Sequence, residues 1–103
     1  MRTFFRTQGC KVQSDDGVVV DPFFGHELAS YECNGERWMV PCECWDRKDG
    51  TAVRGLYINR GAVYKKGAFG VPVDEAMLSQ LREDMLSAFA AAGIEAELHQ
   101  FQS

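Results

Sequence analysis

Turn-forming residues recur at intervals of roughly ten to twenty residues across the first two thirds of this chain. The turns at Ser14–Gly17, Asn34-Gly35, Asp49-Gly50 and Arg60-Gly61 separate segments rich in Val, Tyr, Phe and Trp. Asn34-Gly35 is the strongest of them, because both residues tolerate the positive φ that a type I′ hairpin turn requires. This spacing predicts a set of short antiparallel strands, each joined to the next along the chain.

The first two predicted strands differ in whether a residue interrupts them. The segment from Arg2 to Gln13 has strand character throughout, so we expect a single strand there. The segment Val18–Phe24 contains Pro22, which has no N–H to donate to a neighbouring strand. We therefore expect this strand to lie at a sheet edge or to end at Pro22. The sequence leaves open whether the chain self-associates through such an edge.

The pattern changes to that of a helix after Val73. Asp74 is a predicted N-cap, and Glu75 lies in the first turn, where the helix dipole favours negative charge. Gly93 is predicted to end the helix. Apolar residues recur between these limits at three- and four-residue steps, at Leu78, Leu81, Met85, Ala88, Phe89 and Ala92.

Alternating residues from Ile94 to Phe101 predict a final strand with Glu95, Glu97 and His99 on its wet face. The apolar stripe of the helix needs a partner, and the β-meander offers the only large apolar face. We therefore expect a single α+β domain over residues 1–103. Its antiparallel β-meander sheet has one long C-terminal helix packed across one face, followed by the final strand.

Length and charge narrow the possible functions. A chain of 103 residues is long enough for one core without metal or disulfide support. It has no apolar run of membrane-spanning length and no secretory signal, so we expect a cytoplasmic protein without membrane contact. Residues 67–103 hold six Asp/Glu against one Lys/Arg. Such a surface repels nucleic acid and favours a basic protein partner.

The cysteines offer a possible site of chemistry. Cys42 and Cys44 are one residue apart, which places them on one face of a strand and Trp45 on the other. Structural zinc sites use paired thiolates in converging turns, whereas Cys10 and Cys33 are isolated. We therefore predict no cofactor, no metal and no catalytic residue, with Cys42 and Cys44 acting as small buried hydrophobes. A metal-binding domain built from cysteine and histidine is the weaker alternative.

Two thirds of the chain resembles a family of bacterial immunity proteins. The similar segments are "YECNGERWMVPCE" from Tyr31, "GLYINRG" from Gly55 and "VPVDEAMLSQLREDMLSAFAAAGIEAEL" from Val71. They are similar to immunity protein 74, an antitoxin of polymorphic-toxin systems. The resemblance implies a non-enzymatic protein that binds a cognate toxin and blocks it. An acidic domain of this kind steers quickly toward a basic toxin such as a nuclease.

Interface anchors are typically aromatic or arginine side chains rimmed by charge. On that basis the predicted partner-binding residues are Trp45, Asp46, Arg47 and Asp49 around one hairpin turn, and Glu83 and Asp84 on the helix. A small phage- or plasmid-encoded inhibitor of a host enzyme has the same acidic, non-catalytic character. It remains the main alternative function.

Overall fold

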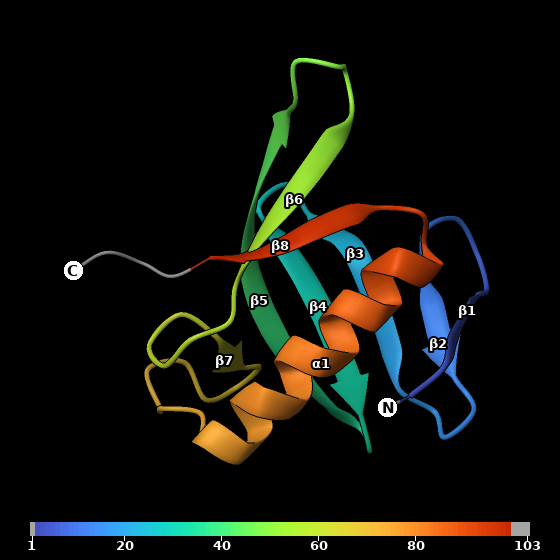
Figure 1. The fold of residues 1–103 in the computed structure, drawn as a ribbon. Coiled ribbons are helices and arrows are strands. Elements are labelled where there is room, and N and C mark those ends of the chain that lie inside the picture. Colours follow the sequence, from blue (N-terminus) through green and yellow to red (C-terminus); the bar gives the residue numbers. More distant parts are fainter. Residues whose placement is uncertain (1, 100–103) are drawn as a thin grey trace.

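The computed structural model describes residues 2–99, which form a curled eight-stranded sheet and one helix (Figure 1). The sheet order is β1-β2-β3-β4-β5-β6-β8, and β7 pairs with β5 outside this path. The strands are β1 (Phe4–Arg6), β2 (Val12–Ser14), β3 (Val19–Gly25), β4 (Leu28–Cys33), β5 (Glu36–Asp46), β6 (Ala52–Tyr57), β7 (Tyr64–Lys65) and β8 (Glu95–His99). The predicted α+β class is confirmed.

The predicted turn at Asn34-Gly35 joins β4 to β5. Both residues have positive φ, 53° and 78°, as a type I′ hairpin requires. β5 is eleven residues long and changes partners along its length. Its first half pairs with β4, while its second half, from Cys42 to Asp46, pairs with β6. On the edge that β6 leaves open, Trp38 and Met39 pair with the short strand β7.

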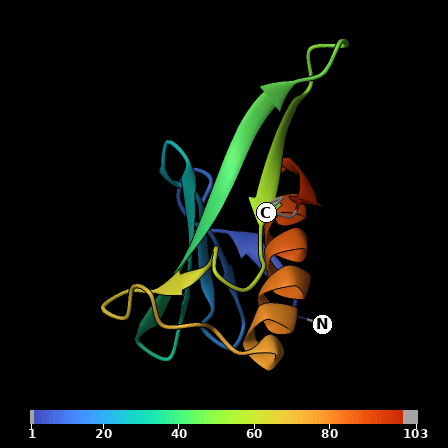
Figure 2. The ribbon, with the colours of Figure 1, turned by 90° about the vertical axis from the view of Figure 1, so that its left-hand side faces the viewer.

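This change of partner gives the molecule a projecting arm. Residues 42–46 of β5 lie beyond the β4 ladder, which ends at the pair Leu28–Pro41. Figures 1 and 2 show the β5–β6 hairpin extending past the body of the sheet. We call this hairpin, with its turn at residues 47–51, the arm.

The helix α1 (Glu75–Ala91) covers the open side of the curled sheet between β1 and β8 (Figures 1 and 2). The Asp74 side chain caps it as predicted, accepting a 2.8 Å hydrogen bond from the Met77 backbone N–H. Its apolar stripe is buried against the inner face of the sheet, where the core includes Val12, Val20, Ala29, Tyr31, Val40, Cys42 and Leu56. Within residues 2–99 no helix has the length and hydropathy needed to cross a membrane.

After Gly93 the chain returns to the sheet as β8, which lies beside β6 and runs parallel to it. The other strand pairs in residues 2–99 are antiparallel. A parallel neighbour requires a long crossover connection, and here residues 58–94, including α1, provide it. A final strand was predicted from Ile94 to Phe101; residues 100 and 101 lie outside the described part of the chain, and the strand is present over Glu95–His99. Its position beside β6 extends the arm into a three-stranded surface.

The structure corrects two strand predictions. The segment from Arg2 to Gln13 is two strands and not one, because Gly9 has a positive φ of 60° and Thr7 and Lys11 close a turn around it. β3 continues through Pro22 and pairs on both sides, contrary to the expectation of an edge or an end. Proline is tolerated because β2 pairs only with Val19 and Val20, and the β3–β4 register shifts between Asp21 and Gly25.

Candidate functional site

The outer face of β5, β6 and β8 gathers aromatic and charged side chains at the base of the arm. The register aligns Trp45 with Val53 and Glu95, and it aligns Tyr57 with His99. Since side chains alternate along each strand, residues at every second position share this face. We call it the arm face, and it comprises Glu43, Trp45, Arg47, Tyr57, Glu95, Glu97 and His99.

Three rings form the centre of the arm face. The His99 ring lies edge-on between two others, with centroids 5.2 Å from Trp45 and 5.9 Å from Tyr57. Gly55 makes this arrangement possible, because a Cβ there would lie 2.7 Å from Trp45 and 3.2 Å from His99. The three rings are half-buried, so each presents part of its surface to solvent. They form an aromatic platform.

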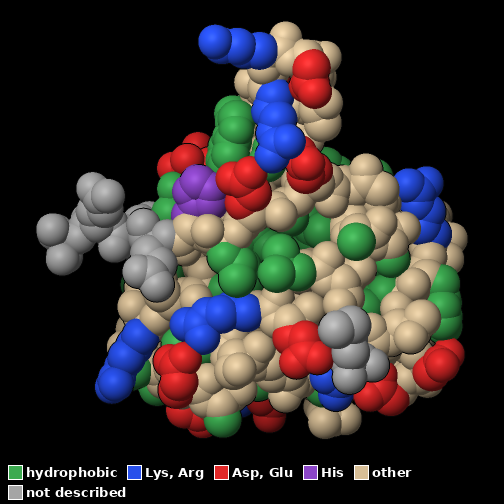
Figure 3. Space-filling view, viewed as in Figure 1, with side chains coloured by type: hydrophobic (Ala, Val, Ile, Leu, Met, Phe, Trp, Pro, Cys, Tyr) green, Lys and Arg blue, Asp and Glu red, His purple; other side chains and the backbone are tan. Residues whose placement is uncertain are grey.

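Carboxylates surround this platform. Arg47 reaches from the arm to β8 and pairs with Glu95 at 3.0 Å and with Glu97 at 2.9 Å. On the other side, a hydrogen bond from the Tyr57 phenol to the Glu43 carboxylate raises the pKa of Tyr57. Figure 3 shows acidic side chains, a histidine and a cationic side chain together over β8. With three carboxylates and one guanidinium, the arm face has net negative charge.

The structure brings together only part of the predicted interface. Trp45 and Arg47 lie on the arm face. Asp46 is exposed but alternates to the other side of β5. Asp49 lies in the arm turn, where its carboxylate accepts a 2.9 Å hydrogen bond from the Thr51 N–H. That backbone hydrogen bond lowers the pKa of Asp49 and gives the side chain a local role in shaping the turn.

The two helix residues of the predicted interface, Glu83 and Asp84, differ completely in their exposure to solvent. Glu83 is exposed, as expected for the outer side of α1. Asp84 is buried, with 3% of its surface exposed, so its predicted place on an exposed surface is wrong. Its carboxylate accepts hydrogen bonds from Tyr31 Oη at 2.5 Å and from Arg2 Nη1 at 2.7 Å.

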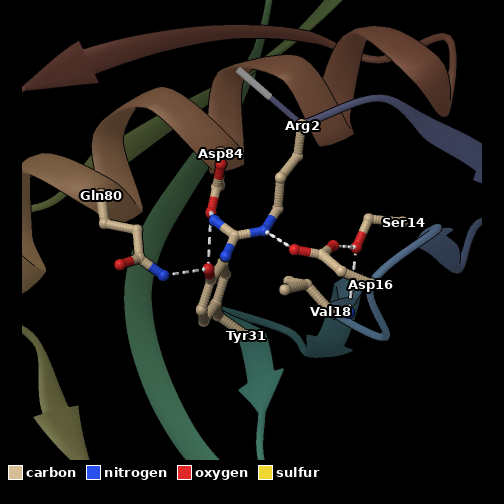
Figure 4. A network of polar contacts seen from close by, with 7 residues as sticks. All are labelled: Arg2, Ser14, Asp16, Val18, Tyr31, Gln80 and Asp84. Carbon is tan, nitrogen blue, oxygen red and sulfur yellow. Dashed lines mark hydrogen bonds and ion pairs between the residues drawn. The ribbon is translucent and has the colours of Figure 1, made fainter.

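Figure 4 shows how this carboxylate joins three parts of the chain. Arg2 also donates from Nε to Asp16 at 2.8 Å, and Gln80 donates to the Tyr31 hydroxyl at 2.8 Å. Burial, followed by the hydrogen bond to Asp84, raises the pKa of Tyr31. We call this group the Asp84 network, and it comprises Arg2, Ser14, Asp16, Tyr31, Gln80 and Asp84. Its polar atoms bond one another, which indicates a structural role.

The cysteines do not converge. Cys42 is buried, and burial raises the pKa of its thiol, as expected for a small hydrophobe in the core. Cys44 is exposed, contrary to prediction, because β5 has passed beyond the cover of β4 at this point. Cys10 and Cys33 lie elsewhere, on the first hairpin and at the end of β4. Across residues 2–99, no group of three or more His, Cys, Asp or Glu side chains is arranged to hold a metal ion.

Five arm-face residues were absent from the predicted interface, namely Glu43, Tyr57, Glu95, Glu97 and His99. The alternation of the final strand already placed Glu95, Glu97 and His99 on one wet face. The missing information was the pairing of β8 with β6, which sets those side chains beside Trp45 and Arg47. Comparisons of the chain with protein-family models, with curated proteins and with solved structures give no match.

Proposed function

We propose that this protein is a non-enzymatic inhibitor that binds a cognate bacterial toxin through the arm face. It would act in the manner of the immunity proteins that its sequence pattern resembles. The observation that carries the proposal is the composition of the arm face, where an aromatic centre is rimmed by carboxylates on three paired strands. Binding hot spots are typically rigid aromatic side chains surrounded by a polar rim.

Charge indicates the partner. The chain has a net charge of −4, and the arm face contributes to it through Glu43, Glu95 and Glu97. A basic partner, such as a nuclease toxin, is attracted to this surface at a distance, which raises the association rate. The aromatic centre then provides the buried contact that slows dissociation.

The first experiment is isothermal titration calorimetry with the purified product of the adjacent gene. Truncation Trp45→Ala is expected to weaken binding by about 30-fold or more, as for a hot-spot residue worth at least about 2 kcal/mol. The substitution Gly55→Ala is a sharper variant, because the new Cβ displaces the Trp45 and His99 rings without removing them. Unchanged affinity in both variants would exclude the arm face as the interface.

Charge variants at two places distinguish electrostatic steering by the arm face from the effect of the overall negative charge. Glu95→Gln with Glu97→Gln is expected to slow association and to flatten its salt dependence. Asp15→Asn removes an exposed carboxylate from the β2–β3 turn, at the far side of the sheet, and is expected to leave the rate nearly unchanged. Glu83→Lys tests whether the interface extends onto α1. If Asp15→Asn slows association as much as the arm-face variants do, the charge of the arm face has no specific role in binding.

A further inference from the structure

The connection between β6 and α1, residues 58–74, forms a hollowed surface that shares no residue with the arm face. Figures 1 and 2 place it with β7, at the end of the molecule away from the arm turn. Two adjoining hollows of about 340 and 290 Å³ share Val71 and Pro72 as a common wall. We call this pair of hollows the loop groove.

Apolar side chains of the loop groove are unusually exposed. Phe69 has 82% of its surface exposed and Val71 has 59%, whereas the other exposed large hydrophobics among residues 2–99 have 50% or less. Phe69 is held in place by an edge contact with Tyr64 at a centroid distance of 5.1 Å. Trp38 and Met77 line the hollow on the other side. An exposed apolar patch bordered by polar groups is characteristic of a protein-binding surface.

The free charges at the loop groove are positive. Lys65 lies over the Trp38 ring at 5.9 Å and pairs with Glu36 at 2.8 Å. Arg60 lines one hollow, and Lys66 lines a neighbouring hollow that shares Lys65. Neither Arg60 nor Lys66 forms an ion pair with any residue between 2 and 99.

The carboxylates around the loop groove are already engaged. Glu36 and Glu32 line the neighbouring hollow and pair with Lys65 at 2.8 Å and with Arg37 at 3.5 Å. Asp74 also borders the groove, but its side chain is engaged in capping α1. Arg37, which lines the hollow with Lys66, has a buried Nε atom without a hydrogen-bond partner. The charged side chains that no ion pair within residues 2–99 engages, Arg60 and Lys66, are therefore both cations, which favour carboxylates.

We propose that the loop groove binds an acidic, apolar segment of a second partner protein. Two apolar side chains of that segment occupy the hollows beside Phe69 and Val71, and its carboxylates pair with Arg60 and Lys66. At about 340 and 290 Å³ the two hollows lie at the lower end of the range for small-molecule pockets, about 300 to 1,000 Å³, so each has room for one large apolar side chain. This proposal goes beyond toxin binding, because the arm face is acidic and selects the opposite charge.

The test uses a random 12-residue peptide library displayed on phage, selected against the full chain at about 0.15 M salt. Enriched peptides are expected to carry net negative charge and at least two large apolar residues. Synthetic copies are then measured by fluorescence anisotropy. The double variant Phe69→Ser/Val71→Ser is expected to weaken binding at least about tenfold, and Arg60→Glu/Lys66→Glu is expected to weaken it and reduce its salt dependence.

Controls distinguish this surface from the rest of the molecule. Phe5→Ser removes another exposed aromatic, 47% exposed, from β1 at the far edge of the sheet, and it is expected to leave peptide affinity unchanged. Trp45→Ala is also expected to leave it unchanged, so the two binding surfaces are tested separately. Circular dichroism confirms that each variant is folded.

Three results would overturn the proposal. In the first, selection on the wild-type chain enriches peptides no more than selection on the Phe69→Ser/Val71→Ser variant does. In the second, the enriched peptides are neutral or basic. The third is concentration-dependent dimerisation in analytical ultracentrifugation that this same double variant abolishes, since the occupant would then be a second copy of the chain.

Discussion

Arg2 and Arg47 make the same kind of contact in two different environments. Each guanidinium bridges two carboxylates, Arg2 between Asp16 and Asp84 and Arg47 between Glu95 and Glu97. The side chain of Asp84 is 4% exposed, whereas the side chains in the Arg47 group are each more than 40% exposed. Because Asp84 is buried, we expect the first group to contribute much more to the free energy of unfolding than the exposed second group.

The largest expected difference between the two groups concerns Asp84. Substitution Asp84→Ala leaves the Arg2 guanidinium and the Tyr31 hydroxyl without their shared acceptor. We expect the free energy of unfolding to fall by about 3–5 kcal/mol, as when one partner of a buried pair is removed. Urea unfolding monitored by circular dichroism measures this. The adjacent variant Glu83→Ala is the control, with a change of about 0.5 kcal/mol or less for a surface site.

A smaller loss is expected for Tyr31→Phe, which removes the hydroxyl and leaves the Asp84 carboxylate one donor short. The free energy of unfolding is expected to fall by about 1–3 kcal/mol. Tyr31 also makes stability depend on alkaline pH, because its pKa in the folded protein is raised above the value of 10.0. Its contribution is complete below that pH and declines as the pH rises toward the raised pKa.

The Tyr31→Phe variant therefore serves as the control for the pH dependence of stability. Unfolding of the wild-type protein and of Tyr31→Phe is compared between about pH 8 and pH 11. The wild type is expected to lose more stability over this range. The buried Cys42 thiol, whose pKa is also raised, gives both proteins a decline of the same sign. Parallel profiles for the two proteins would show that folding does not raise the pKa of Tyr31.

The smallest stability effect is expected for Arg47→Ala. Exposed ion pairs contribute about 0–1 kcal/mol, so the free energy of unfolding is expected to change little and even less at high salt. Urea unfolding at two salt concentrations measures it. A loss as large as that of Asp84→Ala would show that the arm face belongs to the folding core, and the contrast between the two arginines would disappear.

Local chemistry made much of the fold predictable. Asn34-Gly35 specified its turn, and Asp74 and Gly93 marked the ends of the helix. The burial of Asp84 also had a signal, because residues 81, 84, 85 and 88 share one helix face and the other three are apolar. The interface prediction missed it by treating every carboxylate on α1 as exposed.

Other features depend on contacts between distant parts of the chain. The parallel pairing of β8 with β6 brings Glu95 and Glu97 to Arg47 across about fifty residues of sequence, and no local pattern specifies it. The exposure of Cys44 similarly depends on where β4 stops pairing with β5. Two residues of the predicted interface, Trp45 and Arg47, therefore lie on the arm face, but the sequence did not predict the pairing of strands that forms this surface.

Hydrogen–deuterium exchange on the protein, alone and bound to the adjacent gene's product, separates the arm face from the rest of the molecule. We expect binding to slow exchange in residues 43–57 and 95–99, which carry the arm face. Residues 28–33 of β4, which include Tyr31 of the Asp84 network, are expected to exchange equally slowly in both states. Protection confined to the outer side of α1 or to β1 and β2, with the arm unchanged, would show that the arm face is not the interface.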